Sequence, residues 1–136
     1  MTEMSKEEIA RFVMQGTFTG KLATVRKDGS SHVVPIWFVL AYSTSVKANN
    51  IRRNNRVSIC IDDQTRPFSF VTIFGSAKIH IHKQKEVLKW ATKIAGRYMG
   101  KKNAEAYGRR NSSEGAMLVR INPTRIIAEK DITGWD

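Results

Sequence analysis

The segment Lys21–Leu40 constrains the fold most, because it holds two apolar runs on either side of Asp28-Gly29. Such a dipeptide favours a tight hairpin turn whose two central residues take positive φ. We therefore expect strands over Lys21–Arg26 and His32–Leu40. The second strand is nearly all apolar, which predicts that both faces are covered or that one face meets a ligand or another subunit. Pro35 cannot donate to a strand ladder, so it marks an edge or a bulge.

The rest of the chain alternates short strands with a few helices. Helices are expected over residues 5–16, 46–54, 83–99 and 103–110. Further strands are expected over residues 56–62, 68–82, 117–121 and 125–129, with a turn at Asn122-Pro123 between the last two. The 136 residues suit one domain, residues 1–136. Many strands with few helices indicate a mainly β fold, a small antiparallel β-barrel with flanking helices.

The start of the first helix carries its own signal. Ser5 can accept a hydrogen bond from the backbone of Glu8, and the Glu8 carboxylate can reach back to the backbone of Ser5. This reciprocal arrangement is a capping box, and Met4 and Ile9 stand where an apolar contact would close it.

The chain is strongly basic, with 23 lysines and arginines against 12 acidic residues and a net charge of +11. This charge predicts attraction to polyanions such as nucleic acid, anionic lipid or a phosphorylated cofactor. The basic residues gather at Lys47–Arg56 and at Lys83–Arg110. The second group falls mostly on a helix, where a solvated face is the plainer interpretation. Aromatic residues do not alternate with the basic ones in a stacking pattern, which counts against nucleic acid.

Location and redox state follow from three features. The longest apolar run, Val33–Tyr42, holds ten residues and is too short for a membrane span of roughly 20. The N-terminal residues carry acids where a signal peptide would be basic and then apolar. The single cysteine, Cys60, excludes an intrachain disulfide and suits a small buried side chain. We therefore expect a cytoplasmic protein that does not enter a membrane.

Familiar catalytic motifs are missing. The sequence has no G-x-S-x-G elbow, no G-x-G-x-x-G turn and no Walker loop, so no catalytic residue is assigned. His80 and His82 share a face of an expected strand, but a metal site usually needs a third ligand and no cysteine or carboxylate lies nearby. We expect this pair to bind no metal.

A phosphate-like site is one of two open interpretations of the segment Thr44–Asn50. Hydroxyls and backbone N–H groups at a helix start favour an anion, and Lys47 would add a positive charge. A plainly capped helix without a ligand explains the same residues equally well. Nearby, Trp37 and Phe38 alternate along a strand, so at most one faces the core while the other meets a ligand, a partner or solvent.

Three sequence segments, in order, resemble the pyridoxamine 5′-phosphate oxidase-like split-barrel proteins. They are HVVPIWFVL, the S-x-K-x-x-N pattern of Ser45, Lys47 and Asn50, and RRNNRVSICIDDQTRPFSFVTIFGSAKI. IAGRYMG and MLVRINPTRIIAEKD are similar to the branch of that family described as F420-dependent enzymes. The resemblance covers nearly the whole chain, and it rests on the order and spacing of motifs that are weak singly.

The resemblance implies a six-stranded antiparallel split β-barrel that forms a homodimer, with FMN or coenzyme F420 bound at the subunit interface. Some relatives bind haem or nothing. Carried onto this chain, it implies three groups of cofactor-binding residues. The residues that would flank the ring are Val34, Pro35, Ile36 and Trp37. Those that would hold the phosphate or ribityl end are Thr44, Ser45, Lys47 and Asn50. Those that would approach from the other subunit are Gln64, Arg66, Pro67 and Phe68.

One departure from the family pattern lies at Leu40–Ala41. Relatives usually place a strand, a turn and a strand between the WFVL-like strand and the S-x-K segment, whereas here the two run almost directly together. Such a hairpin would need two strands of about five residues each and a turn, and the sequence leaves no room for it between Leu40 and Ala41.

Three functions remain in view. The first is an oxidoreductase in which the cofactor carries hydride to or from a small organic substrate and the protein binds and orients. The polyglutamate tail of F420 would explain part of the positive charge. The second is a non-catalytic protein that binds FMN, F420 or haem. The third is a nucleic-acid binder, motivated by charge alone.

Overall fold

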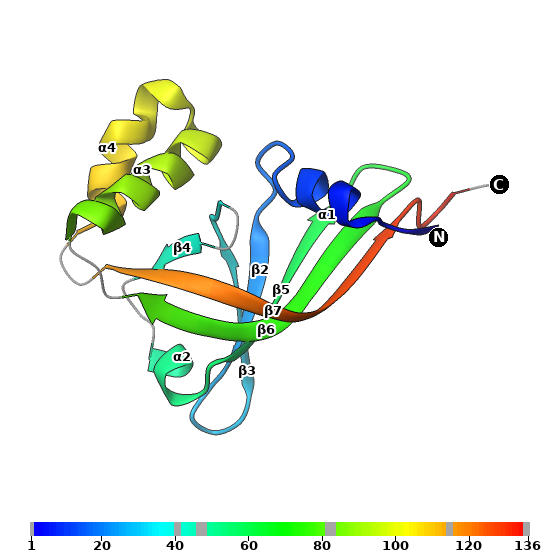
Figure 1. Ribbon diagram of the computed structural model, residues 1–136, viewed down its shortest axis with the longest axis horizontal. Coiled ribbons are helices and arrows are strands. Elements are labelled where there is room, and N and C mark those ends of the chain that lie inside the picture. The colour runs from blue at the N-terminus through cyan, green and yellow to red at the C-terminus, as the bar shows by residue number, and fades with distance from the viewer. Residues whose placement is uncertain (1, 40–41, 46–48, 81–83, 114–115, 135–136) are drawn as a thin grey trace.

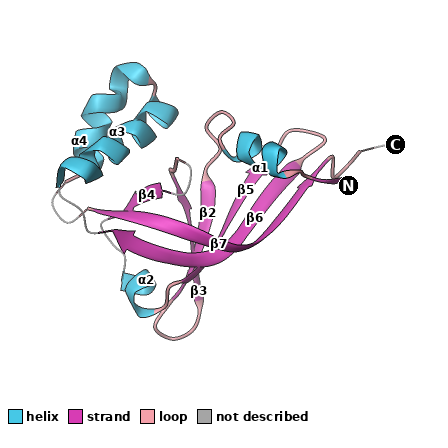
Figure 2. Cartoon of the chain, in the orientation of Figure 1, coloured by secondary structure: helices cyan, strands magenta, loops and turns pink. Residues whose placement is uncertain are grey.

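The structure is a computed structural model and describes residues 2–39, 42–45, 49–80, 84–113 and 116–134. Seven strands form one sheet: β1 (Thr2–Glu3), β2 (Gly20–Val25), β3 (Ser31–Ile36), β4 (Tyr42–Ser45), β5 (Arg56–Asp63), β6 (Ser69–His80) and β7 (Met117–Lys130). The helices are α1 (Lys6–Val13), α2 (Asn49–Arg53), α3 (Gln84–Met99) and α4 (Ala104–Asn111), with the 3₁₀ turn η1 (Lys101–Asn103) before α4. Figures 1 and 2 show α3 and α4 together at one end of the long axis, with α1 over another part of the sheet. None of the described helices is both long and apolar enough to cross a membrane.

The expected mainly β antiparallel fold with flanking helices is confirmed, and every strand pair is antiparallel. The sheet runs in the order β1-β7-β6-β5-β2-β3, and β4 also pairs with β7. The expectation of six strands is wrong: Thr2–Glu3 and residues 42–45 each form an additional strand, while the two strands expected over residues 117–129 are one, which makes seven. Residues 42–45, expected to lead into a helix, pair with β7 as well.

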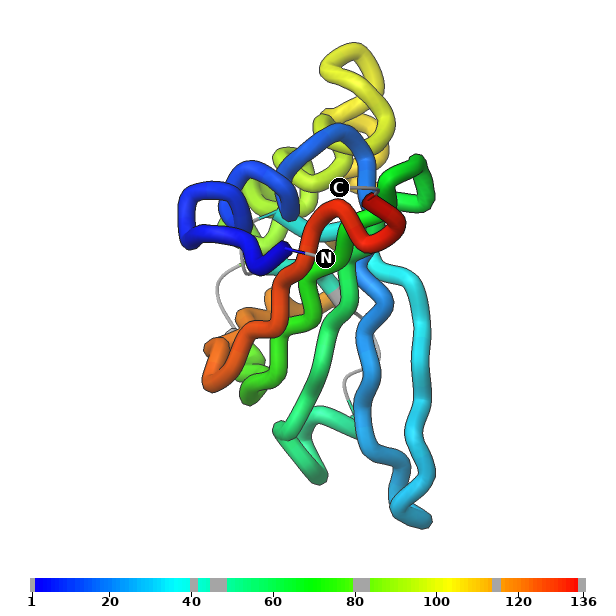
Figure 3. Tube along the Cα trace, turned by 90° about the vertical axis from the view of Figure 1, so that its right-hand side faces the viewer, coloured from blue at the N-terminus to red at the C-terminus, as the bar shows by residue number. Residues whose placement is uncertain are grey.

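The barrel wall is not closed between β3 and β4. β3 ends the main strand order, and β4 pairs with β7 rather than along β3. Val39 and Tyr42 exchange two backbone hydrogen bonds, of 3.0 and 2.8 Å, so the chain passes from β3 to β4 within a very short interval. Leu40 and Ala41 themselves lie outside the described residues. The curved trace in Figure 3 shows the β2–β3 hairpin projecting beyond the rest of the sheet.

The β2–β3 hairpin forms as expected, with Lys21 opposite Pro35 and Val25 opposite Ser31. The turn differs from the one expected, because Gly29, at φ 88°, has positive φ and Asp28 does not. The Asp28 carboxylate instead accepts hydrogen bonds from the backbone and hydroxyl of Ser30. These bonds hold the Asp28 pKa below its ordinary value.

The expected turn at Asn122-Pro123 is wrong, because β7 runs unbroken from Met117 to Lys130 beside β6. The register shifts between Phe74 and Gly75, which leaves Thr124 as an extra residue opposite them. Proline is tolerated at such a bulge because no ladder donor is needed there. A Cβ on Gly75 would lie 2.2 Å from the Asn122 carbonyl oxygen, so only glycine allows this approach.

The α1 capping box is confirmed. The Glu8 backbone donates to the Ser5 hydroxyl, and the Ser5 backbone donates to the Glu8 carboxylate. Glu8 also pairs with Lys130 at the end of β7, which ties α1 to the sheet.

The core fills the inner faces of the strands and one face of α1. Its most deeply buried side chains include Ile61, Val71 and Val119. Cys60 is only partly buried, contrary to expectation, because alternation along β5 turns its neighbours Ile59 and Ile61 inward.

Trp90 on α3 is only partly buried and lies outside the core. It stacks on Tyr42 with ring centroids 4.4 Å apart, and the Lys93 ammonium lies 4.9 Å from its ring. The buried stripe of α3 is formed instead by smaller side chains, Val87, Ala91, Ile94 and Ala95.

Candidate functional site

A cleft of about 590 Å³ lies where the end of β3 meets β4, α3 and α4. Among the residues that the structure describes, nine line it: four of the twelve expected at a cofactor site, and five others. The four are Pro35, Ile36, Trp37 and Thr44, and the others are Ile94, Tyr107, Arg110, Asn111 and Ser113.

Trp37 lines the cleft while its neighbour enters the core. Phe38 is 6% exposed and belongs to the central apolar cluster. Trp37 stacks on Tyr98 of α3, with ring centroids 5.0 Å apart and planes 7° apart. The expected division of roles between these two aromatic residues is therefore confirmed.

Arg97 and Tyr98 hold the segment after β3 in place. The Arg97 guanidinium donates to three backbone carbonyls: those of Val13 and Phe38 at 2.8 Å each, and that of Gly16 at 3.1 Å. The Tyr98 hydroxyl donates to the Phe18 carbonyl at 2.8 Å and accepts from the Phe38 N–H at 3.3 Å. Hydrogen bonds from a charged donor to a carbonyl are among the stronger ones. Arg97 and Tyr98 therefore fix the backbone at Phe38, which adjoins Trp37.

Burial shifts the titration of both anchoring side chains. It lowers the pKa of the Arg97 guanidinium and raises the pKa of the Tyr98 phenol, since each charged form loses hydration. The guanidinium carbon also lies 4.6 Å from the ring centroid of Phe38 and 5.0 Å from that of Tyr98. These contacts favour the cation at this partly buried position.

Helix α4 supplies the polar side of the cleft, which the sequence did not reveal. Arg110 lines the cleft, and its guanidinium lies 5.9 Å from the ring centroid of Tyr107. Its neighbour Arg109 pairs instead with Glu105 at 3.4 Å, with a mostly exposed side chain. The sequence signal was the Tyr107-x-x-Arg110 spacing within the second basic group, which suggested only a solvated face.

The expected phosphate-binding residues are dispersed. Thr44 lines the cleft, and Ser45 follows it on β4 rather than at a helix start. Asn50 lies on α2, where its amide donates to the Thr24 hydroxyl at 3.2 Å and its oxygen accepts from Arg53 at 3.0 Å. Lys47 lies outside the described residues.

A second cleft, of about 820 Å³, contains three of the residues expected from another subunit. Arg66, Pro67 and Phe68 line it together with the C-terminal residues Ile132, Thr133 and Gly134. Backbone bonds from Ile132 to the Phe68 carbonyl and from Thr133 to the Pro67 carbonyl, at 3.1 and 3.0 Å, hold the two segments together. Gln64 is exposed nearby on the same loop but is not in the lining.

Phe68 has φ 63°, a strained value for a bulky residue. The two backbone bonds from the C-terminal turn help to hold it there, and such strain is often found at binding sites.

The two clefts do not meet within one chain. Figure 1 shows α4 toward one end of the long axis and the β5–β6 connection, which carries Arg66, toward the other. Strand β3 presents apolar side chains to solvent, with Val33 62% and Val34 37% exposed. Val34 therefore lies on the same strand as Pro35 and Ile36 but outside the first cleft.

The lining of the first cleft fits a flat, phosphorylated ligand better than a metal. Trp37 and Ile36 offer apolar surface, while Arg110, Asn111, Thr44 and Ser113 offer a positive charge and hydrogen-bonding groups. Among the described residues, no three or more histidines, cysteines or carboxylates gather as metal ligands. His80 lies at the end of β6, and His82 is outside the described residues.

Solved structures of similar fold include three informative ones. A conserved hypothetical protein from Mycobacterium tuberculosis has a TM-score of 0.81 and 26% identity, covering 98% of this chain and 89% of its own. A protein named F420 reductase has a TM-score of 0.69 and 22% identity, covering 85% and 94%. The haem storage protein HutZ from Vibrio cholerae has a TM-score of 0.68 and 19% identity, covering 90% and 94%.

The family is shown by the sequence itself. No curated protein sequence matches the chain. The family model described as pyridoxamine 5′-phosphate oxidase matches residues 5–129, nearly the whole chain and all of the strands except β1 and the last residue of β7. The similar structures agree with this in fold. The chain belongs to the pyridoxamine 5′-phosphate oxidase family and has its split-barrel architecture.

Proposed function

We propose that this protein is a homodimeric oxidoreductase that holds FMN or coenzyme F420 between its subunits. The observation that carries the proposal is a cleft lined both by the apolar Trp37 and Ile36 and by the polar Thr44 and Arg110. When bound, such a cofactor would supply hydride transfer to or from a small organic substrate. The chain's own residues would bind, orient and exclude water.

The first cleft would hold the ring and the phosphate of the cofactor. Pro35, Ile36 and Trp37 would contact the flat ring system, with Trp37 fixed by Tyr98. Arg110 and the Thr44 hydroxyl would bind the phosphate, because a guanidinium and a hydroxyl suit its oxygens. Val34, Ser45, Lys47 and Asn50 complete the proposed set on this subunit.

The second cleft would close the site from the partner subunit. One chain places the two clefts apart, so only a second copy can bring Arg66, Pro67 and Phe68 over the first cleft, with Gln64 beside them. A two-fold dimer would make two such sites. It would also cover exposed apolar residues at the edge strand β3, Val33 and Val34.

A titration of the full chain with FMN and with F420, followed by absorbance, tests the proposal. We expect micromolar binding of at least one cofactor with one site per subunit, and a dimer by light scattering. Arg110→Ala should weaken binding about tenfold or more, since a charge-assisted phosphate contact is lost. Arg109→Ala removes the same charge from the exposed side of α4 and should bind normally. Failure of both FMN and F420 to bind would refute the proposal.

A second candidate function is cofactor or haem binding without catalysis. The described lining of the first cleft holds no carboxylate, histidine, cysteine or lysine. Tyr107 is its one side chain of a type that commonly serves in proton transfer, so the described lining offers mostly contacts. This alternative predicts stoichiometric binding, with no reoxidation of the reduced cofactor by nitro, quinone or unsaturated carbonyl acceptors. Turnover of any such acceptor would favour the oxidoreductase.

A further inference from the structure

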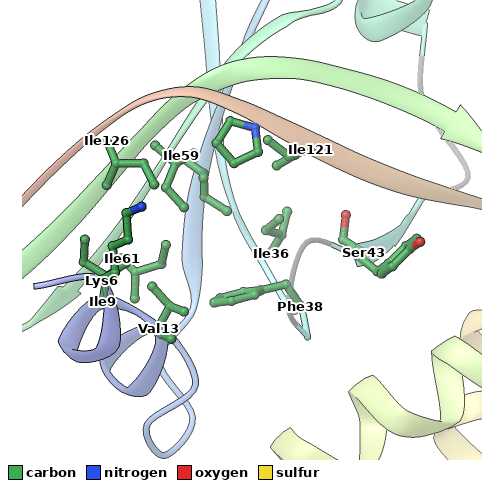
Figure 4. A pocket seen from close by; sticks show the side chains of 14 residues that line it. Lys6, Ile9, Val13, Ile36, Phe38, Ser43, Ile59, Ile61, Ile121 and Ile126 are labelled. Carbon is green, nitrogen blue, oxygen red and sulfur yellow. The ribbon is translucent and has the colours of Figure 1, made fainter.

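A separate apolar cavity of about 410 Å³ lies between α1 and the inner face of the open sheet (Figure 4). Seven isoleucines from α1, β3, β5, β6 and β7 supply half of its lining residues. Protein interiors leave few voids larger than a water molecule, whose share of liquid volume is about 30 Å³. Ligand pockets span roughly 300–1,000 Å³, so this cavity is large enough for a small molecule.

A buried hydroxyl marks one end of this cavity. Alternation along β4 places Thr44 in the first cleft and Ser43 in the cavity lining. Ser43 is 6% exposed, and its hydroxyl forms no hydrogen bond with any residue that the structure describes. A buried polar group without a partner destabilises a fold. An oxygen on a bound ligand would provide that partner.

A positive charge marks the other end. Lys6 begins α1, and Figure 4 shows its side chain reaching toward Ile126 of β7, away from Ser43. Lys6 is the one charged residue in the described lining, and it has no ion-pair partner within the described part of the chain. The neighbouring carboxylate of Glu8 already pairs with Lys130 and accepts a hydrogen bond from the Ser5 backbone in the α1 capping box. The Lys6 residue is exposed, and a ligand group that pairs with its ammonium would be anionic.

We propose that this cavity binds an elongated apolar carboxylate, such as a medium-chain fatty acid. The carboxylate pairs with Lys6, the hydrocarbon lies among the isoleucines, and an oxygen at the far end of the ligand bonds to Ser43. Isoleucine side chains are stiff at χ1, so the lining is largely preformed. The site is distinct from the cofactor cleft, with which its described lining shares only Ile36. It does not depend on the proposed function.

Calorimetric titration of the full chain tests the ligand class. The probes are octanoate, decanoate, ω-hydroxydecanoate and decanol. Decanoate should bind more tightly than octanoate, by about fourfold for each added methylene. It should bind more tightly than decanol, and ω-hydroxydecanoate should bind at least as tightly as decanoate despite its extra polar group. Failure of every carboxylate to bind saturably at millimolar concentration would overturn the proposal.

Four variants locate the site. Lys6→Met should weaken decanoate binding about two- to fivefold, the range of exposed ion pairs, without changing decanol binding. Lys27→Met removes an equal charge from the distant β2–β3 turn and should have no effect. Ala10 lines the cavity from an exposed position on α1. Ala10→Phe should therefore fill the cavity and abolish binding of all four probes. Ser43→Ala should weaken only ω-hydroxydecanoate.

Two further results would overturn the assignment. One is equal binding by Lys6→Met, Ala10→Phe and the unmodified chain, which would place the carboxylate elsewhere. The other is a change of oligomeric mass in Ala10→Phe without carboxylate binding by the unmodified chain. In that case a second copy of the chain, rather than a small molecule, covers the cavity.

Discussion

Trp37 at the end of β3 lies nearly parallel to Tyr98 of α3, with ring centroids 5.0 Å apart and planes 7° apart. The two residues are 61 positions apart in the sequence. The Tyr98 hydroxyl donates to the Phe18 carbonyl in the α1–β2 connection and accepts from the Phe38 N–H. The neighbouring Arg97 guanidinium donates to the Phe38 carbonyl, next to Trp37. The position of the cleft wall is therefore set by α3 as well as by β3.

The Tyr98 hydroxyl should contribute to stability apart from the stacking. Tyr98→Phe keeps the ring against Trp37 but loses the bonds to Phe18 and Phe38. We expect a loss of about 1–2 kcal/mol in the free energy of unfolding, measured in urea. Tyr107→Phe is the control, because the Tyr107 hydroxyl has no hydrogen-bond partner in the described ranges. Equal effects of the two substitutions would contradict this account.

Stability should depend on pH through Glu8. The hydrogen bond from Lys130, followed by that from the Ser5 backbone, lowers the Glu8 pKa below its ordinary value of 4.5. The folded state therefore binds this proton less readily than the unfolded chain, so the stabilisation is complete above the ordinary pKa. It is lost as the pH falls through the lowered pKa of the folded state.

Glu8→Gln checks this dependence through melting temperatures between neutral and acidic pH. The variant should be less stable than the unmodified chain at neutral pH, and the difference should vanish in acid. Glu7→Gln, an exposed change in the same turn of α1, should leave the pH profile unchanged. A constant difference across the pH range would mean that charge at Glu8 is not responsible.

Gly75 and Gly96 should respond oppositely to alanine. At Gly75 the new Cβ would lie 2.2 Å from the Asn122 carbonyl oxygen, and we expect destabilisation of about 1–3 kcal/mol or more. At Gly96, within α3, the nearest atom would be the Ala104 Cβ at 3.5 Å, an ordinary contact. Gly96→Ala should stabilise the protein by up to about 1 kcal/mol. Denaturant midpoints measure both, and tolerance of Gly75→Ala would show that the bulge can shift.

The sequence predicted the local features of the fold well. The capping box of Ser5 and Glu8, the hairpin around Gly29 and the division between Trp37 and Phe38 each depend on residues close in sequence, and each is present. The β7 turn was predicted wrongly because Asn122-Pro123 suits a turn as well as a bulge. Only the partner strand, with Gly75 opposite, selects the bulge.

The cleft itself could be predicted only in part. Its β3 side followed from the apolar strand, but Arg110 and Tyr107 reach it through the packing of α4, more than 60 residues away. A basic helix face is usually solvated, and nothing local distinguishes Arg110 from Arg109. The second cleft is also a tertiary feature, since Phe68 meets the C-terminal turn through two backbone bonds.

The central claim is that each cofactor site combines Arg110 of one subunit with Phe68 of the other. Mixing subunits tests it directly. Arg110→Glu and Phe68→Glu should each abolish cofactor binding as homodimers. A mixed dimer of the two variants would hold one intact site and one site with both changes. The account predicts that co-refolded mixtures regain binding, with one cofactor per mixed dimer; mixed dimers that form but bind no cofactor would contradict it.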